Sequence, residues 1–223
     1  MSEKLPYSRS GLYRRQLISE IAQLEWEMFS AVPNVGGPAV CQNRKDVFFV
    51  MRAAQHAIWS DDTLESYRAD LLTAQKNQLN LMTCKYGYMM AKTFPEEYEE
   101  LKNRLPQVSE EKRTLAAQLT RQHMAWTKEA ADRYPGICSH GRPLDEISRY
   151  TTWPSVENYF FCELLTYSCA TLQLCARDFE EDARRRRNPA IQILNEIAVC
   201  HGYTHLEELE TTLTGGYGGG KAR

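Results

Sequence analysis

Apolar residues recur at helical spacing along most of the 223-residue chain, and this periodicity is the feature that most restricts its fold. A spacing of three to four residues places apolar side chains on one face of a helix, whereas a half-buried strand needs strict alternation. No alternating run of useful length occurs. The sequence therefore predicts an all-α protein, a single-domain bundle of about seven to eight helices.

Local signals divide the chain into one helical domain between two flexible ends. Ser155 is expected to cap a buried central helix that continues to about Arg184, after an irregular segment from Tyr134 to Pro154. No internal repeat is strong enough to indicate a solenoid. The predicted organisation is a flexible segment over residues 1–12, a helical domain over 13–213 and a flexible glycine-rich tail over 214–223.

Composition narrows the class of protein. A formal charge of −2 gives no general reason to bind nucleic acid, which normally requires a basic surface. The polar N-terminus lacks the apolar region of a secretory signal, and no segment is apolar enough for a membrane helix. Seven cysteines without a paired framework are typical of reduced thiols. We therefore expect a cytoplasmic protein that binds neither nucleic acid nor membrane.

Familiar catalytic motifs do not occur in the sequence. There is no Walker loop, no dinucleotide-binding glycine motif, no nucleophile elbow and no HExxH helix. Pairs of Glu-x-x-His, which a di-iron bundle requires, are also missing. The sequence predicts neither an organic cofactor nor a dedicated metal site.

Four ionisable side chains fall on apolar helix faces. Glu25 lies near the centre of the apolar arc of the first helix, and Lys85 occupies the middle of the arc that starts at Leu81. Arg52 and Gln55 share a stripe with Phe48 and Trp59. Glu163 lies in the predicted central helix beside Tyr159 and Tyr167. Two carboxylates, one ammonium and one guanidinium are thus predicted to point inward in four different helices.

A buried charge must pair, bind a ligand or shift its pKa, because an unpaired charge in the core costs several kcal/mol. A carboxylate whose pKa is raised by burial can act as an acid or base near neutral pH, and Arg52 suits a substrate carboxylate. Arg142, in the long irregular segment, could close over a bound anion. The alternative is that the four groups form salt bridges that fix the helix register.

Several stretches, taken in order, resemble a family of bacterial proteins of about 200 residues with unknown function. They are LEWEMF, CQ at Cys41 and Gln42, MRAAQ, NLMTCKYGYMM, GRP and ENYFFCELLTYS, within about Leu17 to Glu210. The resemblance carries no catalytic assignment. Its pattern includes Glu25, Arg52, Gln55, Lys85, Tyr86, Arg142, Glu157, Glu163 and Tyr167.

These observations predict a small cofactor-independent enzyme that acts on a compact anionic metabolite bearing a carboxylate, by a lyase, isomerase or hydrolytic step, in specialised-metabolite biosynthesis. The expected catalytic residues are Glu25, Lys85, Glu163 and Tyr167. The expected binding residues are Arg52, Gln55, Trp59, Tyr86, Arg142, Glu157 and Tyr159. Two alternatives stay open: a non-catalytic module that binds a metabolite or a protein, and a carboxylate site for Mg²⁺ or Mn²⁺ formed by Glu25, Glu157 and Glu163. The sequence also leaves a homodimer open.

Overall fold

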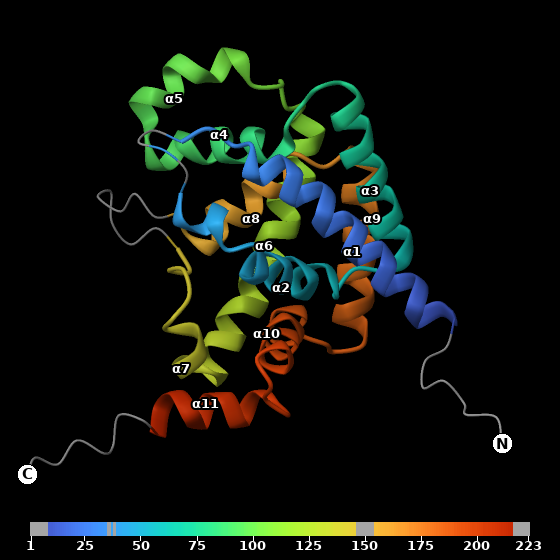
Figure 1. The fold of residues 1–223 in the computed structure, drawn as a ribbon, viewed down its shortest axis with the longest axis vertical. Coiled ribbons are helices and arrows are strands. Elements are labelled where there is room, and N and C mark those ends of the chain that lie inside the picture. The colour runs from blue at the N-terminus through green and yellow to red at the C-terminus, as the bar shows by residue number, and fades with distance from the viewer. Residues whose placement is uncertain (1–8, 35–36, 38, 146–153, 216–223) are drawn as a thin grey trace, which may run out of the picture.

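The structure is a computed structural model that describes residues 9–34, 37, 39–145 and 154–215. These residues form eleven α-helices and two short 3-10 helices, and no strand occurs among them, so the predicted all-α class is confirmed (Figure 1). The helices are α1 (Arg9–Ser30), α2 (Lys45–His56), α3 (Asp61–Lys76), α4 (Leu81–Thr93), α5 (Pro95–Leu101), α6 (Glu110–Arg133), α7 (Pro135–Cys138), α8 (Val156–Leu164), α9 (Cys169–Arg184), α10 (Pro189–Cys200) and α11 (Leu206–Gly215), with 3-10 turns at Val40–Asn43 and Lys102–Arg104.

Polar caps fix where many of these helices begin. At each of six N-termini a serine or asparagine side chain accepts a hydrogen bond from the backbone N–H three residues later, which satisfies one of the free donors of the first turn. The capping residues are Ser60, Asn80, Ser109, Ser155, Ser168 and Asn188. The first helix begins at Arg9, earlier than the sequence suggested, and the last ends at Gly215. Residues 1–8 and 216–223, within the predicted flexible ends, lie outside the described residues.

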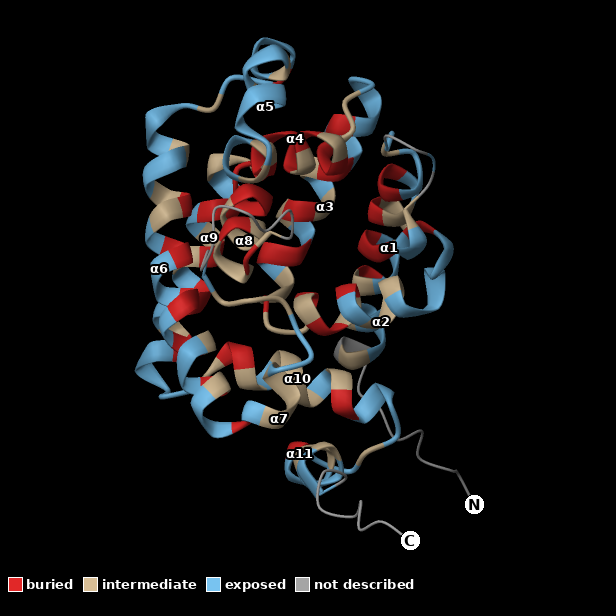
Figure 2. Ribbon diagram, turned by 90° about the vertical axis from the view of Figure 1, so that its left-hand side faces the viewer, coloured by how far each residue is buried: buried red, intermediate tan, exposed pale blue. Residues whose placement is uncertain are grey.

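Two long helices organise the bundle. Helix α1 packs against α2, α3 and α4, and α6 packs against α8, α9 and α10. Between these groups α3 contacts α9, α4 contacts α8, and α2 contacts α10. Figure 2 shows the buried residues on the helix faces that point toward one another. At one end of the molecule α7 and α11 pack together, with a small second apolar cluster around Tyr134, Ala198 and Leu206 (Figure 1). Within the described residues, no helix has both the length and the apolar character to cross a membrane.

The predicted central helix is in fact two helices, and the expected total of seven to eight is too low. Helix α8 ends at Leu164, and α9 begins at Cys169. The side chain of Ser168 caps α9 by accepting from the N–H of Thr171, and Asp70 of α3 accepts from the N–H of Ser168 at 2.9 Å. These bonds end the helix although the apolar periodicity continues. A one-turn helix, α7, also forms inside the segment predicted to be irregular.

Gln42, from the stretch that follows α1, is a structural residue. Its side-chain amide donates to the carbonyls of Phe29 and Val32, and its side-chain oxygen accepts from Asn34 and from the N–H of Ala39. All the polar atoms of this buried amide therefore have partners. The amide ties the connection between α1 and α2 to the end of α1.

Two aspartates join α3 and α9 reciprocally. Asp178 of α9 accepts from the N–H of Ser60 at 2.9 Å and from the hydroxyl of Thr63 at 2.6 Å, at the start of α3. Asp70 of α3 makes the same two bonds to Ser168 and Thr171, at 2.9 and 2.7 Å, at the start of α9. Each carboxylate also lies near the positive end of a helix dipole. We call this arrangement the aspartate clasp.

We predict that Asp70→Asn and Asp178→Asn each lower the free energy of unfolding by about 1–3 kcal/mol, because each removes hydrogen bonds to a charged acceptor. Denaturant titration at neutral pH measures the change. Asp132→Asn, on the exposed face of α6, is the control and should leave the stability unchanged. A clasp variant as stable as this control would contradict the role assigned to the clasp.

Candidate functional site

Arg52 connects two buried carboxylates from helices that are distant in sequence. Its guanidinium donates to both oxygens of Glu25, with Nε 2.7 Å from Oε2. The same group donates to Glu163 over 2.8 and 3.2 Å. Glu25, Arg52 and Glu163 are 0%, 3% and 7% exposed. A planar guanidinium with five donors suits this double pairing, which a lysine could not make.

Lys85 extends this row of charges from the other side. Its Nζ lies 2.5 Å from Oε2 of Glu163 and 3.4 Å from the ring centroid of Tyr159. The guanidinium carbon of Arg142 lies 4.7 Å from the centroid of the same ring. Two cations therefore contact one aromatic ring, each in cation–π geometry. We call Glu25, Arg52, Lys85 and Glu163 together the charged centre.

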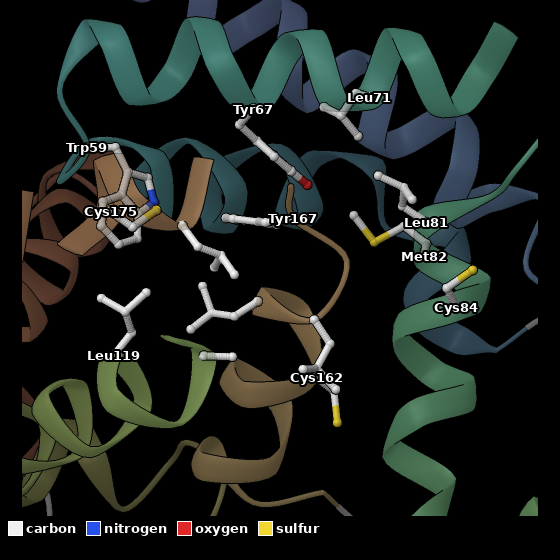
Figure 3. Close-up of a cluster of buried hydrophobic side chains, with 14 of the residues drawn as sticks. Trp59, Tyr67, Leu71, Leu81, Met82, Cys84, Leu119, Cys162, Tyr167 and Cys175 are labelled. Atoms are coloured by element: carbon white, nitrogen blue, oxygen red, sulfur yellow. The ribbon is translucent and has the colours of Figure 1, made fainter. Parts of the chain in front are cut away.

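Neutral polar groups complete the hydrogen bonding of the charged centre. Tyr67 donates to Glu25 at 2.8 Å, and Tyr167 donates to Glu163 at 3.2 Å. The rings of these two tyrosines are 4.3 Å apart, and Figure 3 shows them together in the core. His56 places Nε2 3.0 Å from Glu25, while its Nδ1 has no partner. The side-chain oxygen of Gln55 accepts from Arg52.

Pairing controls the protonation of both carboxylates. Burial alone raises the pKa of Glu25, but the charge of Arg52 and the hydrogen bonds from His56 and Arg52 outweigh it and lower the pKa to about 2. Burial likewise opposes ionisation of Glu163, and Arg52 with Lys85 hold its pKa well below the usual range. Burial and then the nearby carboxylate raise the pKa of Tyr67 and of Tyr167, so both phenols remain donors.

These pKa directions differ from the expectation that burial raises the pKa of a buried carboxylate. The physical reason is the number of donors: each carboxylate receives bonds from a guanidinium and a phenol, and a further bond from either His56 or Lys85. At neutral pH both groups are therefore anions. With Lys85 as an ammonium, two negative and two positive charges balance within the centre.

One side of the charged centre is less deeply buried than the rest. Gln55, Tyr86, Tyr159 and Arg142 are each partly exposed, whereas the ions behind them are buried. The ring of Tyr86 packs near that of Phe29, with centroids 6.2 Å apart. Burial first, and then the proximity of Tyr159 and Cys41, raise the pKa of Tyr86. We call Gln55, Tyr86, Tyr159 and Arg142 the rim of the charged centre, because these side chains keep some solvent-exposed surface.

Comparison with known families agrees with the resemblance seen in the sequence. Residues 15–211 match the model of a family described as a protein of unknown function (DUF4125). The chain belongs to this family. No curated protein and no solved structure matches it. The family therefore names no reaction, and any function has to come from the site itself.

Most of the predicted site residues come together, and two do not. The charged centre, Gln55 and Tyr167 are linked by hydrogen bonds, and Tyr86, Tyr159 and Arg142 form the rim. Trp59 instead stacks on Phe179 of α9 with ring centroids 5.1 Å apart. Glu157 lies partly exposed in the first turn of α8, and its backbone N–H donates to the carbonyl of Leu144. Its carboxylate makes no described bond to the charged centre.

Sequence reasoning missed His56 and Tyr67. His56 follows Arg52 by four residues, so it projects from the same face of α2, and this spacing was a signal that could have found it. Tyr67 lies among the apolar residues of α3 and looks like an ordinary core aromatic. Within the described part of the chain, no three His, Cys, Asp or Glu side chains are arranged to hold a metal ion. In this structure Glu25 and Glu163 are joined by a guanidinium.

We predict that Glu25→Gln reveals a pH-dependent contribution to stability. Because the folded-state pKa of about 2 lies below the ordinary 4.5, the contribution is full above pH 4.5 and declines as the pH falls toward 2. The shift corresponds to roughly 3 kcal/mol. Denaturant titration of both proteins from pH 7 to 2.5 should show their difference shrinking at low pH.

The matched control for this prediction is Glu27→Gln on the exposed side of α1, which should leave the pH dependence of wild type unchanged. A difference between wild type and Glu25→Gln that stays constant across this pH range would show that Glu25 is not held ionised by its partners.

His123 is a second buried imidazole with an unpartnered Nδ1. It stacks on Phe160 of α8 with centroids 4.0 Å apart. Burial lowers its pKa to about 4, although Glu163 acts in the opposite direction. The ring is therefore neutral in the folded protein near neutral pH.

We predict that His123→Phe removes a loss of stability in weak acid. The unfolded chain binds a proton at this residue below about pH 6.5, whereas the folded chain does so only below about 4, so wild type loses stability as the pH falls between these values. At pH 5 the loss amounts to roughly 2 kcal/mol. Unfolding at pH 7.5 and 5 measures it, with the exposed His201→Gln as control. An unchanged pH dependence in His123→Phe would refute the assignment.

Proposed function

We propose that this protein is a small enzyme, independent of organic cofactors, that binds a compact carboxylate-bearing metabolite at the rim of the charged centre. One observation carries the proposal: four ionised side chains, each at most 7% exposed, come from four separate helices and meet within hydrogen-bonding distance. Apolar residues at such positions are often equally or more stabilising. Ions kept in a core at this cost suggest a task other than folding.

The cations at the rim determine the kind of ligand that we propose. Lys85 and Arg142 both contact the ring of Tyr159, and because Lys85 already completes the charge balance of the charged centre, Arg142 adds a further positive charge at the rim. An approaching carboxylate would therefore meet a positive local field in a partly desolvated site, where its attraction is stronger than in water. Tyr86 and Gln55 add neutral hydrogen-bonding groups that would orient the ligand.

Each part of the site then has a proposed role. Lys85 and Arg142 bind the carboxylate, and Lys85 stabilises negative charge that develops on the substrate, as lyase or isomerase chemistry requires. Glu163 and Arg52 act as positioning residues, because their bonds hold Lys85 and each other in one geometry. The low pKa of Glu25 and of Glu163 makes either carboxylate a weak base. We therefore propose positioning roles for them in place of the acid–base roles suggested by the sequence.

The same low pKa favours a second candidate function, a module that binds the metabolite without turning it over. A site whose carboxylates do not exchange protons near neutral pH is well suited to recognition alone. Product formation from a bound ligand distinguishes the two functions, since both share the rim and the charged centre.

Lys85→Met provides the test. It removes one cation but leaves Glu163 its bonds from Arg52 and Tyr167, so we expect the free energy of unfolding to fall by less than the about 3–5 kcal/mol that breaking a buried pair costs. Binding of carboxylate metabolites should weaken at least tenfold, because a hydrogen bond to a charged group is lost. A panel of dicarboxylic and amino acids is screened by thermal shift, and mass spectrometry follows turnover in a metabolite extract.

Lys76→Met, at the exposed end of α3, is the matched control and should bind the panel like wild type. If Lys85→Met alone loses about 3 kcal/mol or more, the charged centre is a structural salt-bridge network and the proposal fails. Turnover lost in Lys85→Met with the fold intact supports the enzyme. Binding without any product supports the module.

A further inference from the structure

The second half of the helical bundle repeats the first at a fixed distance along the chain. Helix α3 covers residues 61–76 and α9 covers 169–184, so both have 16 residues and begin 108 positions apart. The three residues that α3 and its N-cap contribute to the aspartate clasp recur at this distance: Ser60 with Ser168, Thr63 with Thr171, and Asp70 with Asp178. The clasp is therefore symmetric in chemistry and in spacing.

The turns before these helices are also the same. Helix α2 ends at His56 and α8 at Leu164, again 108 residues apart. The next residue in each case, Ala57 or Leu165, has φ −63° and ψ −19°. The capping serines follow in extended conformation, with φ −65° and −69°. Four consecutive residues thus fold alike in two sequences that differ at most positions.

The turns after these helices share a rarer feature. Within the described chain, Gln78 and Arg186 are the two non-glycine residues with positive φ, at 56° and 54°. Such a conformation is uncommon for residues other than glycine, and the two are 108 residues apart. Two positions later Asn80 and Asn188 cap α4 and α10. A chance coincidence of two strained residues at this spacing is a poor explanation.

The first helices, α1 and α6, match at a distance of 98 residues. Asn80 donates to the carbonyl of Met28 in α1, and Asn188 donates to that of Trp126 in α6. Arg14 donates to the carbonyl of Ala57, and Lys112 donates to that of Leu165. In both pairs of contacts, the residue numbers in α1 and α6 differ by 98, whereas the numbers of their partner residues differ by 108. The change in shift falls in the connection after the long helix, which is longer in the second half.

The helix contacts between the two halves have the pattern expected of two copies related by a two-fold axis. Helix α3 meets its own equivalent α9, and the contact of α4 with α8 is matched by that of α10 with α2. In an isologous interface between two identical copies, residue i of the first copy contacts residue j of the second, and residue j of the first contacts residue i of the second. The same relation holds here between two segments of one chain.

We propose that this chain is a duplicated four-helix unit, with α1–α4 as one copy and α6 with α8–α10 as the other, and that the partner of each copy is the other copy. The two copies pair about a pseudo-two-fold axis through the aspartate clasp. The surface through which the two copies contact each other corresponds to the interface of a homodimer, and here both copies belong to one polypeptide.

This relation also explains why the charged centre exists once. The counterpart of Glu25 is His123, that of Arg52 is Phe160, and that of Lys85 is Ile193. Where the first copy has an ion pair between its first two helices, the second has the stack of His123 on Phe160. Equivalent helices are thus held together by rings in one place and by ions in the other. The second copy therefore packs its first two helices through a ring stack at the place where the first copy uses its ion pair.

A cut between the copies tests the pairing, independently of any ligand or reaction. A protease site is inserted after the exposed Gln107 in the full-length chain, which is purified folded and then cleaved. We expect the fragments 1–107 and 108–223 to remain together as a one-to-one complex in size-exclusion chromatography. After separation in denaturant and mixing, they should regain most of the helicity of the uncut chain by circular dichroism. If the insertion lowers the helicity of the uncut chain, the site is placed after Asn103.

The control cut lies after the exposed Gln78, inside the first copy. This cut divides the first copy, with α1–α3 on one fragment and α4 joined to the whole second copy on the other, so we expect the fragments to regain at most half as much helicity on mixing. A first half that dimerises with itself also supports the proposal, because the copies share one pairing surface. Halves that separate after cleavage, or that recover no better than the control fragments, overturn it.

Discussion

The guanidinium of Arg52 is the interaction on which the arrangement of the core depends. It bonds to Glu25 on α1 and to Glu163 on α8, two helices that are far apart in the chain. A carboxylate in the core is tolerated only while its donors remain in place, since an unpaired buried charge costs several kcal/mol. Arg52 therefore fixes the relative positions of α1, α2 and α8, and Glu163 in turn fixes Lys85 on α4.

The charged centre lies where it does because of how the two halves of the bundle meet. Glu25, Arg52 and Lys85 come from the first half, whereas Glu163, Tyr159 and Tyr167 come from the second. The contact of α4 with α8 brings Lys85 to Glu163. At the equivalent contact of α10 with α2, Ile193 takes the place of Lys85. One pairing surface therefore carries a buried lysine on one side of the axis and an isoleucine at the equivalent position on the other.

Electrostatic balance shapes the chemistry that this site can support. Both carboxylates are held as anions by the cations and phenols around them, so they hold a geometry in place and are not suited to carry protons near neutral pH. Lys85 and Arg142 differ from them because they lie against the partly exposed ring of Tyr159. In the proposed function the deeply buried charges orient these two cations, and a ligand meets the cations at the rim.

Sequence periodicity predicted the inward-facing ions well, because a helix fixes which side chains share a face whatever the helix packs against. It therefore found Glu25, Arg52, Lys85 and Glu163 as well as most of the rim. His56 shared the face of Arg52 and could have been found in the same way. Periodicity failed between residues 165 and 168, where the apolar pattern runs on but Asp70 from another helix caps the backbone.

The pKa directions and the repeated four-helix unit depend on contacts between helices, and such contacts cannot be read from the periodicity of a single sequence. The pKa directions of Glu25 and Glu163 follow from donors on several other elements of the chain, so burial alone suggested the wrong sign. The repeat of the four-helix unit is nearly invisible in the sequence because few residues other than the capping serines, threonines and clasp aspartates are shared between α3 and α9. By itself the sequence determined the all-helical class, the buried faces of most helices and the ions on them. Only the tertiary structure decided that these ions meet, which of them pair, and that Trp59 and Glu157 lie apart, because pairing is set by distances between segments that are distant along the chain.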